Sequence, residues 1–192
     1  MAIGGVQRER VSTGTAASEA AAFAAALESA IADLSSLIER TEGEGADILA
    51  FQVAMLEDDA LLLPARAMIL SGKPADEAWR KTVDAEIVGY ELSDDDYFRA
   101  RAADLKDMRD RVLKHLAGEG AAAFSPGAIL VGEDIPPTLF LEADWTKGGG
   151  IALTQGSASS HVAMLARARG VPMVVGLGDI ALNGHSEAVI DG

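Results

Sequence analysis

One of the three histidines in the 192-residue sequence, His161, lies between a loop of small residues and a short apolar segment. The stretch GSASSHVAMLARARGVPMVVG, residues 156–176, puts Gly156 and three serines just before this histidine. The apolar spacing after it predicts a helix from His161 to about Arg169, closed by Gly170. Side chains in a first helical turn lean toward the N-terminus, so the imidazole is expected to overhang the loop.

The start of a helix is a chemically distinctive place for a histidine. Its unpaired N–H groups carry a partial positive charge, which stabilises a phosphate dianion and disfavours a protonated imidazole. A neutral imidazole is a nucleophile, so His161 is suited to accept a phosphoryl group and hold it as a phosphoramidate. A single histidine is more often structural than catalytic, however, and the residues alone leave both interpretations open.

Two other kinds of site are disfavoured. The sequence GSASS does not match the G-x-S-x-G motif, and adjacent Ser160 and His161 do not by themselves form a catalytic triad. His115, His161 and His185 are far apart in the sequence and form no H-x-x-x-H pair, so no metal site is predicted. His115 is explained by the dipole at the end of a helix, and His185 by a solvent-facing turn, LNGHS.

Composition narrows the range of partners and surroundings. The formal net charge is −14, and seven acids stand against one base from Glu39 to Asp59. Such a surface would repel nucleic acid and attract a basic protein surface, although the acids could also serve only for solubility. The absence of cysteine favours a reducing, cytoplasmic setting and excludes disulfides and thiolate metal sites. No signal peptide is evident, and the most apolar window, ALLLPARAMIL, is too short to cross a membrane, so no membrane partner is expected.

The first part of the chain shows helical periodicity. Apolar residues at spacings of three and four predict amphipathic helices, and Pro64 is expected to end or kink the second of them. A good capping residue, Ser93, and a stop at Gly118 bound the fourth. Four helices with short turns predict an antiparallel four-helix bundle over residues 14–118.

After Gly118 the pattern changes to short β-type runs separated by glycine and proline. Strands are predicted at five places: AILVG (128–132), TLFLE (138–142), GIAL (150–153), PMVVG (172–176) and EAVID (187–191). Together with the single helix at His161, they predict a compact α/β unit. The opening residues also have an extended pattern, so residues 1–13 plus 119–192 are expected to form this domain, with residues 14–118 inserted into it.

The stretch that contains His161 resembles the phosphohistidine motif of phosphoenolpyruvate-utilising enzymes. This family includes enzyme I of the sugar phosphotransferase system, pyruvate phosphate dikinase and phosphoenolpyruvate synthase. The motif is a glycine-rich loop, Ser-His, a short helix with Ala-Arg, and a proline-containing strand that ends in Val-Gly. The matching residues are Gly156, Ser160, His161, Ala166, Arg167, Pro172, Val175 and Gly176. MLEDDAL (55–61) and residues 94–118 resemble enzyme I in particular, where they belong to a helical subdomain that docks a histidine phosphocarrier protein.

The resemblance implies an α+β or α/β architecture, a swivelling phosphohistidine domain with an inserted carrier-binding subdomain. His161 would accept phosphate that originates from phosphoenolpyruvate, at Nε2 as in enzyme I, and pass it to a histidine of the carrier. The implied supports of the phosphate are Gly156, Ser159, Ser160 and Arg167, and the implied carrier contacts are Gln52, Met55, Glu57 and Asp58. No cofactor is expected on this chain, because phosphoenolpyruvate and Mg²⁺ would bind a C-terminal barrel that these residues do not supply.

Three positions depart from the family pattern. Ser157 replaces a second loop glycine, Gln52 replaces a histidine of the second helix, and Pro136 replaces a threonine after the ILVGEDIPPT strand. Thr138 is the nearest substitute for that threonine. Arg167, six residues after the histidine, either touches the phosphate or holds the helix in place. Two alternatives therefore stay open: a carrier-binding or regulatory module that transfers no phosphate, and the swivelling domain of a dikinase-like enzyme.

Overall fold

The computed structural model describes residue 12, residues 14–119, 124–158 and 160–178, and residue 190. The chain divides into two compact units. One is a helical unit within Gln7–Ala121, and the other is a mixed unit of short strands and helices within Ala122–Gly192. The predicted contribution of residues 1–13 to the second unit lies, except for Ser12, outside the described residues and stays a prediction.

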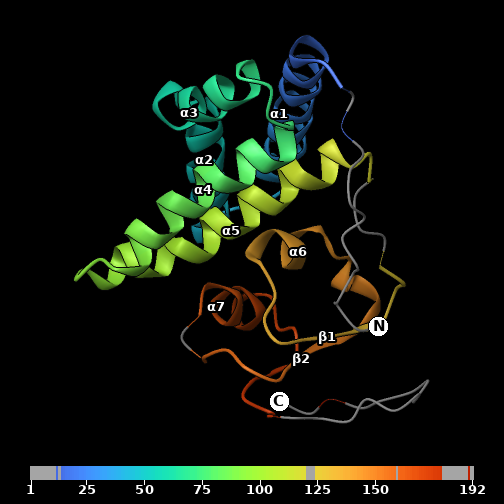
Figure 1. Ribbon diagram of the computed structural model, residues 1–192. Helices are drawn as coiled ribbons and strands as arrows, with labels where there is room; N and C mark the ends of the chain where they lie inside the picture. Colours follow the sequence, from blue (N-terminus) through green and yellow to red (C-terminus); the bar gives the residue numbers. More distant parts are fainter. Residues whose placement is uncertain (1–11, 13, 120–123, 159, 179–189, 191–192) are drawn as a thin grey trace. The chain divides into compact units, whose positions relative to one another are not determined.

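The helical unit has five helices in its described residues (Figure 1). They are α1 (Ala16–Ile38), α2 (Glu44–Glu57), α3 (Asp59–Leu70), α4 (Ala75–Glu91) and α5 (Asp96–Leu116). α1 begins where the side chain of Thr15 accepts a hydrogen bond from the N–H of Ser18, which is an N-cap. The large apolar side chains of α1 pack against the other helices, and Phe23, Leu34 and Leu37 are buried there.

By length and composition alone, α1 is apolar enough to cross a membrane. Much of its apolar character comes from alanine, and its exposed face carries small or charged residues such as Ala21, Ala25, Glu28 and Ser36. The large apolar side chains lie on the opposite, buried face. This two-sided pattern is that of a helix in the core of a helical bundle.

Four helices were predicted, but these residues form five, because the second predicted helix is broken at Asp58 into α2 and α3. The backbone of Asp58 is extended (φ −79°, ψ 112°), and its carboxylate accepts a hydrogen bond from the N–H of Ala60 at 2.8 Å. Asp58 therefore caps a new helix, α3. Pro64, which was expected to end or kink the second helix, lies inside α3 and is exposed. The prediction of a single helix up to Pro64 is wrong.

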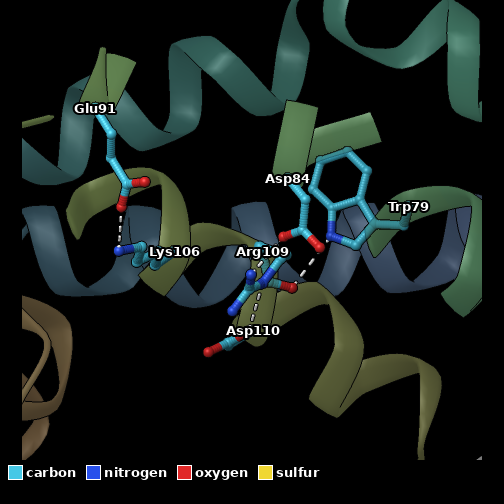
Figure 2. A network of polar contacts seen from close by, with 6 residues as sticks. All are labelled: Trp79, Asp84, Glu91, Lys106, Arg109 and Asp110. Carbon is cyan, nitrogen blue, oxygen red and sulfur yellow. Dashed lines mark hydrogen bonds and ion pairs between the residues drawn. The ribbon is translucent and has the colours of Figure 1, made fainter. Parts of the chain in front are cut away.

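α4 and α5 pair along their length, and Figure 2 shows polar contacts of this pair. Nε1 of the fully buried Trp79 donates to the backbone oxygen of Arg109 at 3.1 Å. The guanidinium of Arg109 contacts Asp84 of α4 at 2.5 Å and Asp110 of its own helix at 2.8 Å. Burial opposes this charge, but the hydrogen bonds that the guanidinium donates to Asp110 and Asp84, with their negative charges, outweigh it and raise the pKa of Arg109 above its usual value. Arg109 therefore stays charged and ties α4 to α5.

The second unit contains a sheet of three parallel strands in the order β1-β2-β3. The strands are β1 (Ile129–Gly132), β2 (Gly150–Leu153) and β3 (Met173–Val174), and the other elements are α6 (Pro137–Glu142), the 3-10 helix η1 (Trp145–Lys147) and α7 (His161–Ala168). Leu130 pairs with Ile151, which pairs with Met173 on its other side. Leu130, Ile151 and Leu153 are buried, so β2 lies in the core of this unit.

The strands predicted at 128–132, 150–153 and 172–176 are confirmed, as is the helix that begins at His161. The third strand is shorter than predicted, with two residues in regular pairing. The strand predicted at 187–191 lies outside the described residues, apart from residue 190.

The strand predicted at 138–142 is wrong, because these residues form α6. Pro137 takes the first helical position, where its fixed φ and missing N–H favour a helix. Every residue from 137 to 141 is buried. A short segment that is buried on all sides shows no helical periodicity, so its sequence resembles that of a buried strand.

α4 has no capping side chain of its own, since the residue before it is Pro74. The N–H of Ala75, its first residue, instead donates to Oε2 of Glu19 in α1 at 2.7 Å. Ser12 donates to the other oxygen of this buried carboxylate at 3.1 Å. An acid of α1 therefore caps α4 at the positive end of its dipole.

We predict that Glu19→Ala lowers the free energy of unfolding by about 1–3 kcal/mol, because it leaves a buried N–H group without its acceptor. Chemical denaturation of the chain measures this loss. Glu28→Ala is the matched control: Glu28 is an exposed glutamate of the same helix, and its removal should change stability by about 0.5 kcal/mol or less. Equal losses in the two variants would contradict the cap.

Candidate functional site

The candidate site lies at the edge of the sheet where the three parallel strands end (Figure 1). The chain after β2 keeps hydrogen bonds to both neighbouring strands. The N–H of Gln155 donates to the oxygen of Glu133 at 3.0 Å, and the oxygen of Gln155 accepts from the N–H of Gly176 at 3.2 Å. The loop from β2 to α7 therefore starts between the ends of β1 and β3. In parallel sheets, ligands bind at this edge.

The turn into α7 is fixed by Ser160, which is the N-cap, with His161 as the first helical residue. Oγ of Ser160 accepts from the N–H of Ala163 at 3.2 Å, and its own N–H donates to the oxygen of Ser157 at 3.0 Å. His161 is half-buried, so it is not enclosed in apolar packing. A partly exposed imidazole thus lies beside the N–H groups of a first helical turn, where the helix dipole favours anions.

Gly156 turns the chain out of the sheet with a φ of +92°, a conformation that favours glycine. A Cβ at this position would lie 3.5 Å from Leu153 and 3.9 Å from Oδ1 of Asp134, which are ordinary distances, so the backbone and not space requires glycine. Asp134 follows β1, is exposed, and accepts a hydrogen bond from the N–H of Ile135 at 2.9 Å. This carboxylate beside the loop was not predicted. Its position directly after a strand is the signal that could have found it.

Arg167 contacts the loop from within α7. Its Nη2 donates to the backbone oxygen of Ala158 at 3.3 Å. Ala158 lies shortly before His161, so the guanidinium joins the loop to the helix that follows it. This contact holds the helix to the loop, which is one of the two roles expected for Arg167. The other role, a contact with the phosphate, stays a prediction.

The remaining loop residues are placed as follows. Ser159 lies outside the described residues, and Ser157 is exposed. Pro136 is the residue before α6, and Thr138 is buried within that helix. Because α6 packs beside α7, Thr138 lies on the helix that neighbours the one carrying His161.

The four residues predicted to contact a carrier differ in exposure. Gln52 is fully buried, and its Nε2 donates to Oδ2 of Asp107 in α5 at 3.1 Å. Met55 is half-buried, whereas Glu57 and Asp58 are exposed. The last three can touch another protein directly. Gln52 could influence a partner only through the packing of α2 against α5.

A second described histidine, His115, lies in the helical unit, where its Nε2 is 2.8 Å from Oδ2 of Asp33. Arg111 is 3.5 Å from the same oxygen. Within the part of the chain that the structure describes, no group of three or more His, Cys, Asp or Glu side chains is placed to hold a metal ion. In these residues, the groups on α7 and beside the loop before it are an imidazole, backbone N–H groups, hydroxyls, an arginine and the carboxylate of Asp134.

Two family models match the chain. The model described as PEP-utilising enzyme, N-terminal, matches residues 1–101, and the model described as PEP-utilising enzyme, mobile domain, matches residues 124–192. The second match contains His161 and all three described strands. These matches confirm the resemblance that the motif around His161 indicated.

Curated proteins and a solved structure are also similar. The phosphoenolpyruvate-protein phosphotransferase of Listeria monocytogenes is 33% identical over 187 residues, which are 91% of this chain and 32% of that protein. The PEP-dependent dihydroxyacetone kinase, phosphoryl donor subunit DhaM, of Escherichia coli is 32% identical over 161 residues, 80% of this chain and 34% of that protein. The N-terminal domain of Enzyme 1 - Nitrogen matches with a TM-score of 0.67 and 28% identity, covering 88% of this chain and 72% of that one. The chain thus spans about a third of the length of the curated relatives it matches.

We predict that Ser160→Ala destabilises the first turn of α7 by about 1 kcal/mol, since it removes the acceptor of the Ala163 N–H. Ser160→Asp should retain most of the stability, because a carboxylate at the N-cap accepts the same hydrogen bond. Amide hydrogen exchange at Ala163 measures the effect locally, and it should be faster in the alanine variant than in the aspartate variant. Unchanged exchange in Ser160→Ala would show that the cap is not needed.

Proposed function

Because this chain belongs to the family of PEP-utilising enzymes, we propose that His161 accepts a phosphoryl group and passes it to a histidine phosphocarrier protein. The observation that carries the proposal is the position of this histidine. It is the first residue of α7, at the carboxyl edge of a parallel sheet, and it is partly exposed. The N–H groups of a first helical turn stabilise phosphate at such a place.

The proposed transfer uses the lone pair of one imidazole nitrogen, Nε2. This nitrogen attacks phosphorus, a P–N bond forms, and the bond from phosphorus to the donor breaks with its electrons leaving on the donor. With phosphoenolpyruvate as the first donor, the leaving group is the enolate of pyruvate, which then takes up a proton. In the second transfer an imidazole of the carrier attacks the same phosphorus, and the P–N bond to His161 breaks, which restores the neutral ring.

The first donor is proposed to bind elsewhere in a longer protein. The chain spans about a third of the length of its curated relatives, and the described residues contain no metal-binding group. We therefore assign phosphoenolpyruvate and Mg²⁺ to a C-terminal barrel. On this proposal these residues alone release no pyruvate from phosphoenolpyruvate, and they bind no cofactor.

The carrier is proposed to present a basic surface to the helical unit. Glu57 and Asp58 are exposed where α2 meets α3, and the chain carries a net charge of −14. Complementary charge speeds encounter and selects the partner. The same charge opposes nucleic acid as a partner. A cytoplasmic location, where such carriers would meet the chain, belongs to the same proposal.

The two alternatives have less support. A dikinase-like swivelling domain would lack the helical unit, whereas the similar N-terminal domain of Enzyme 1 - Nitrogen covers 88% of this chain. A carrier-binding module that transfers no phosphate was suggested by Ser157, Gln52 and Pro136. Of these, Gln52 is buried and joins α2 to α5 through Asp107, and Pro136 is the residue before α6. Labelling separates this alternative from the proposal.

We predict that the chain gains an acid-labile, base-stable phosphate when it is mixed with a radiolabelled, phosphorylated histidine phosphocarrier protein. His161→Ala should abolish the label and leave the midpoint of thermal unfolding nearly unchanged, because the removed side chain is only half-buried. His115→Asn is the control and should be labelled fully. Label on the alanine variant, or binding of the carrier to the unchanged chain without any label, would refute the proposal.

We further predict that Glu57→Lys weakens binding of the carrier about tenfold, or about 1.4 kcal/mol, because it places a cation opposite a basic surface. The difference should shrink as salt is added. Titration calorimetry at two salt concentrations measures both effects. Glu28→Lys on α1 is the matched control, and Asp58 is left unchanged because it caps α3. Equal affinity of the two lysine variants would place the carrier on another surface.

A further inference from the structure

The end of α7 opposite His161 is held by a stack of three side chains. Arg169, the residue that ends α7, places its guanidinium carbon 5.6 Å from the ring centre of Phe140 in α6. The indole of Trp145 in η1 stacks on Phe140 with ring centres 5.3 Å apart and an interplanar angle of 26°. Nε1 of Trp145 also donates to the backbone oxygen of Phe140 at 2.8 Å. The stack therefore joins α7 to α6 and η1.

Phe140 is a rigid platform for this contact. Its side chain is fully buried, and the stacked indole and the indole hydrogen bond hold it in place. A guanidinium is attracted to the face of an aromatic ring. It is also favoured at the C-terminal end of a helix, where the dipole is negative. Arg169 meets both conditions, although its side chain lies at the surface of the unit.

The helix that Arg169 ends is short, and it packs on α6 and β3 through few large side chains. α7 has eight residues, which is too short to be stable alone, and two of its four buried residues are alanines. Its start is fixed by the cap of Ser160 and by the bond from Arg167 to Ala158. Its end is fixed by the stack on Phe140. Together with the packing of Val162 and Leu165, these contacts hold the helix that carries His161.

The displacement of His161 that a tilt of α7 would cause follows from the length of the helix. Eight residues span about 12 Å, so a tilt of about 10° displaces one end by about 2 Å relative to the other. A displacement of about 1 Å in a reacting group can lower a rate about a hundredfold. A tilt of this size, on loss of the contact between Arg169 and Phe140, would therefore displace His161 far enough to slow a phosphoryl transfer.

We propose that Arg169 is a positioning residue for His161: by stacking on Phe140 it sets the angle of α7 and with it the place of the imidazole at the sheet edge. The proposal rests on the function proposed for His161. It assigns to Arg169 no contact with the phosphoryl group. Removing the cation should slow the transfer itself, whereas binding of the carrier should be unaffected.

The test compares Arg169→Met and Arg169→Lys in single-turnover transfer from the radiolabelled carrier, over a range of carrier concentrations. Arg169→Met should lower the maximal rate at least tenfold with an unchanged half-saturating concentration, and Arg169→Lys, which keeps a cation over the ring, should recover most of it. Arg80→Met, at an exposed arginine of α4, is the matched control and should transfer at the full rate. Full-rate transfer by Arg169→Met, or failure of Arg169→Lys to recover, would overturn the inference.

A second measurement makes the inference independent of transfer. The imidazole resonances of His161, recorded by nuclear magnetic resonance, should shift in Arg169→Met and not in Arg80→Met. If the unchanged chain takes no label, the function proposed for His161 fails, and the resonances alone then decide whether Arg169 positions the ring. Unshifted resonances in a folded Arg169→Met chain would overturn the positioning role.

Discussion

The parallel pairing of β2 between β1 and β3 is the constraint on which the rest of the mixed unit depends. The strands approach closely at the start of β2 because glycines stand there. A Cβ at Gly149 would lie 2.5 Å from the oxygen of Ala128, and one at Gly150 would lie 2.9 Å from the oxygen of Pro172. A larger residue would push the neighbouring strands away. Because the three strands run in one direction, the chain leaves each of them at the same edge, and the loop to His161 starts there.

In their described residues, the two units differ in the length of their helices and in the charge that they bury. The helical unit buries large side chains along long helices, and the rings of Phe23 and Trp79 meet there with centres 5.6 Å apart. It also buries charge, since Asp104 is fully buried and pairs with Arg101 at 3.0 Å. Removing one member of such a pair leaves a buried charge without its partner, which is destabilising. The elements of the mixed unit are shorter, and its core contains Leu130, Phe140 and Ile151. Side-chain caps occur in both units, at Thr15 and Asp58 in the helical unit and at Ser160 in the mixed unit.

The elements that could be predicted from the sequence are those that residues adjacent in the chain specify. The helix at His161 follows from small loop residues, a serine cap and apolar spacing that are contiguous in the chain. α6 does not, because an apolar run of five buried residues suits a strand as well as a helix. Asp58 and Pro64 can each begin or end a helix, and in the structure Asp58 ends α2 and caps α3. The contacts of Gln52 with Asp107, and of Arg169 with Phe140, join residues far apart in the chain, so no local pattern marks them.

The carboxylate of Glu19 has a consequence for how the helical unit assembles. It caps a helix whose first residue follows 56 positions later, so α4 gains this hydrogen bond only when α1 has docked. Forming a contact between residues so far apart in the sequence costs conformational entropy of the intervening chain. The docking of α1 therefore stabilises the start of α4. This coupling between distant parts of the chain favours a single cooperative unfolding transition of the helical unit.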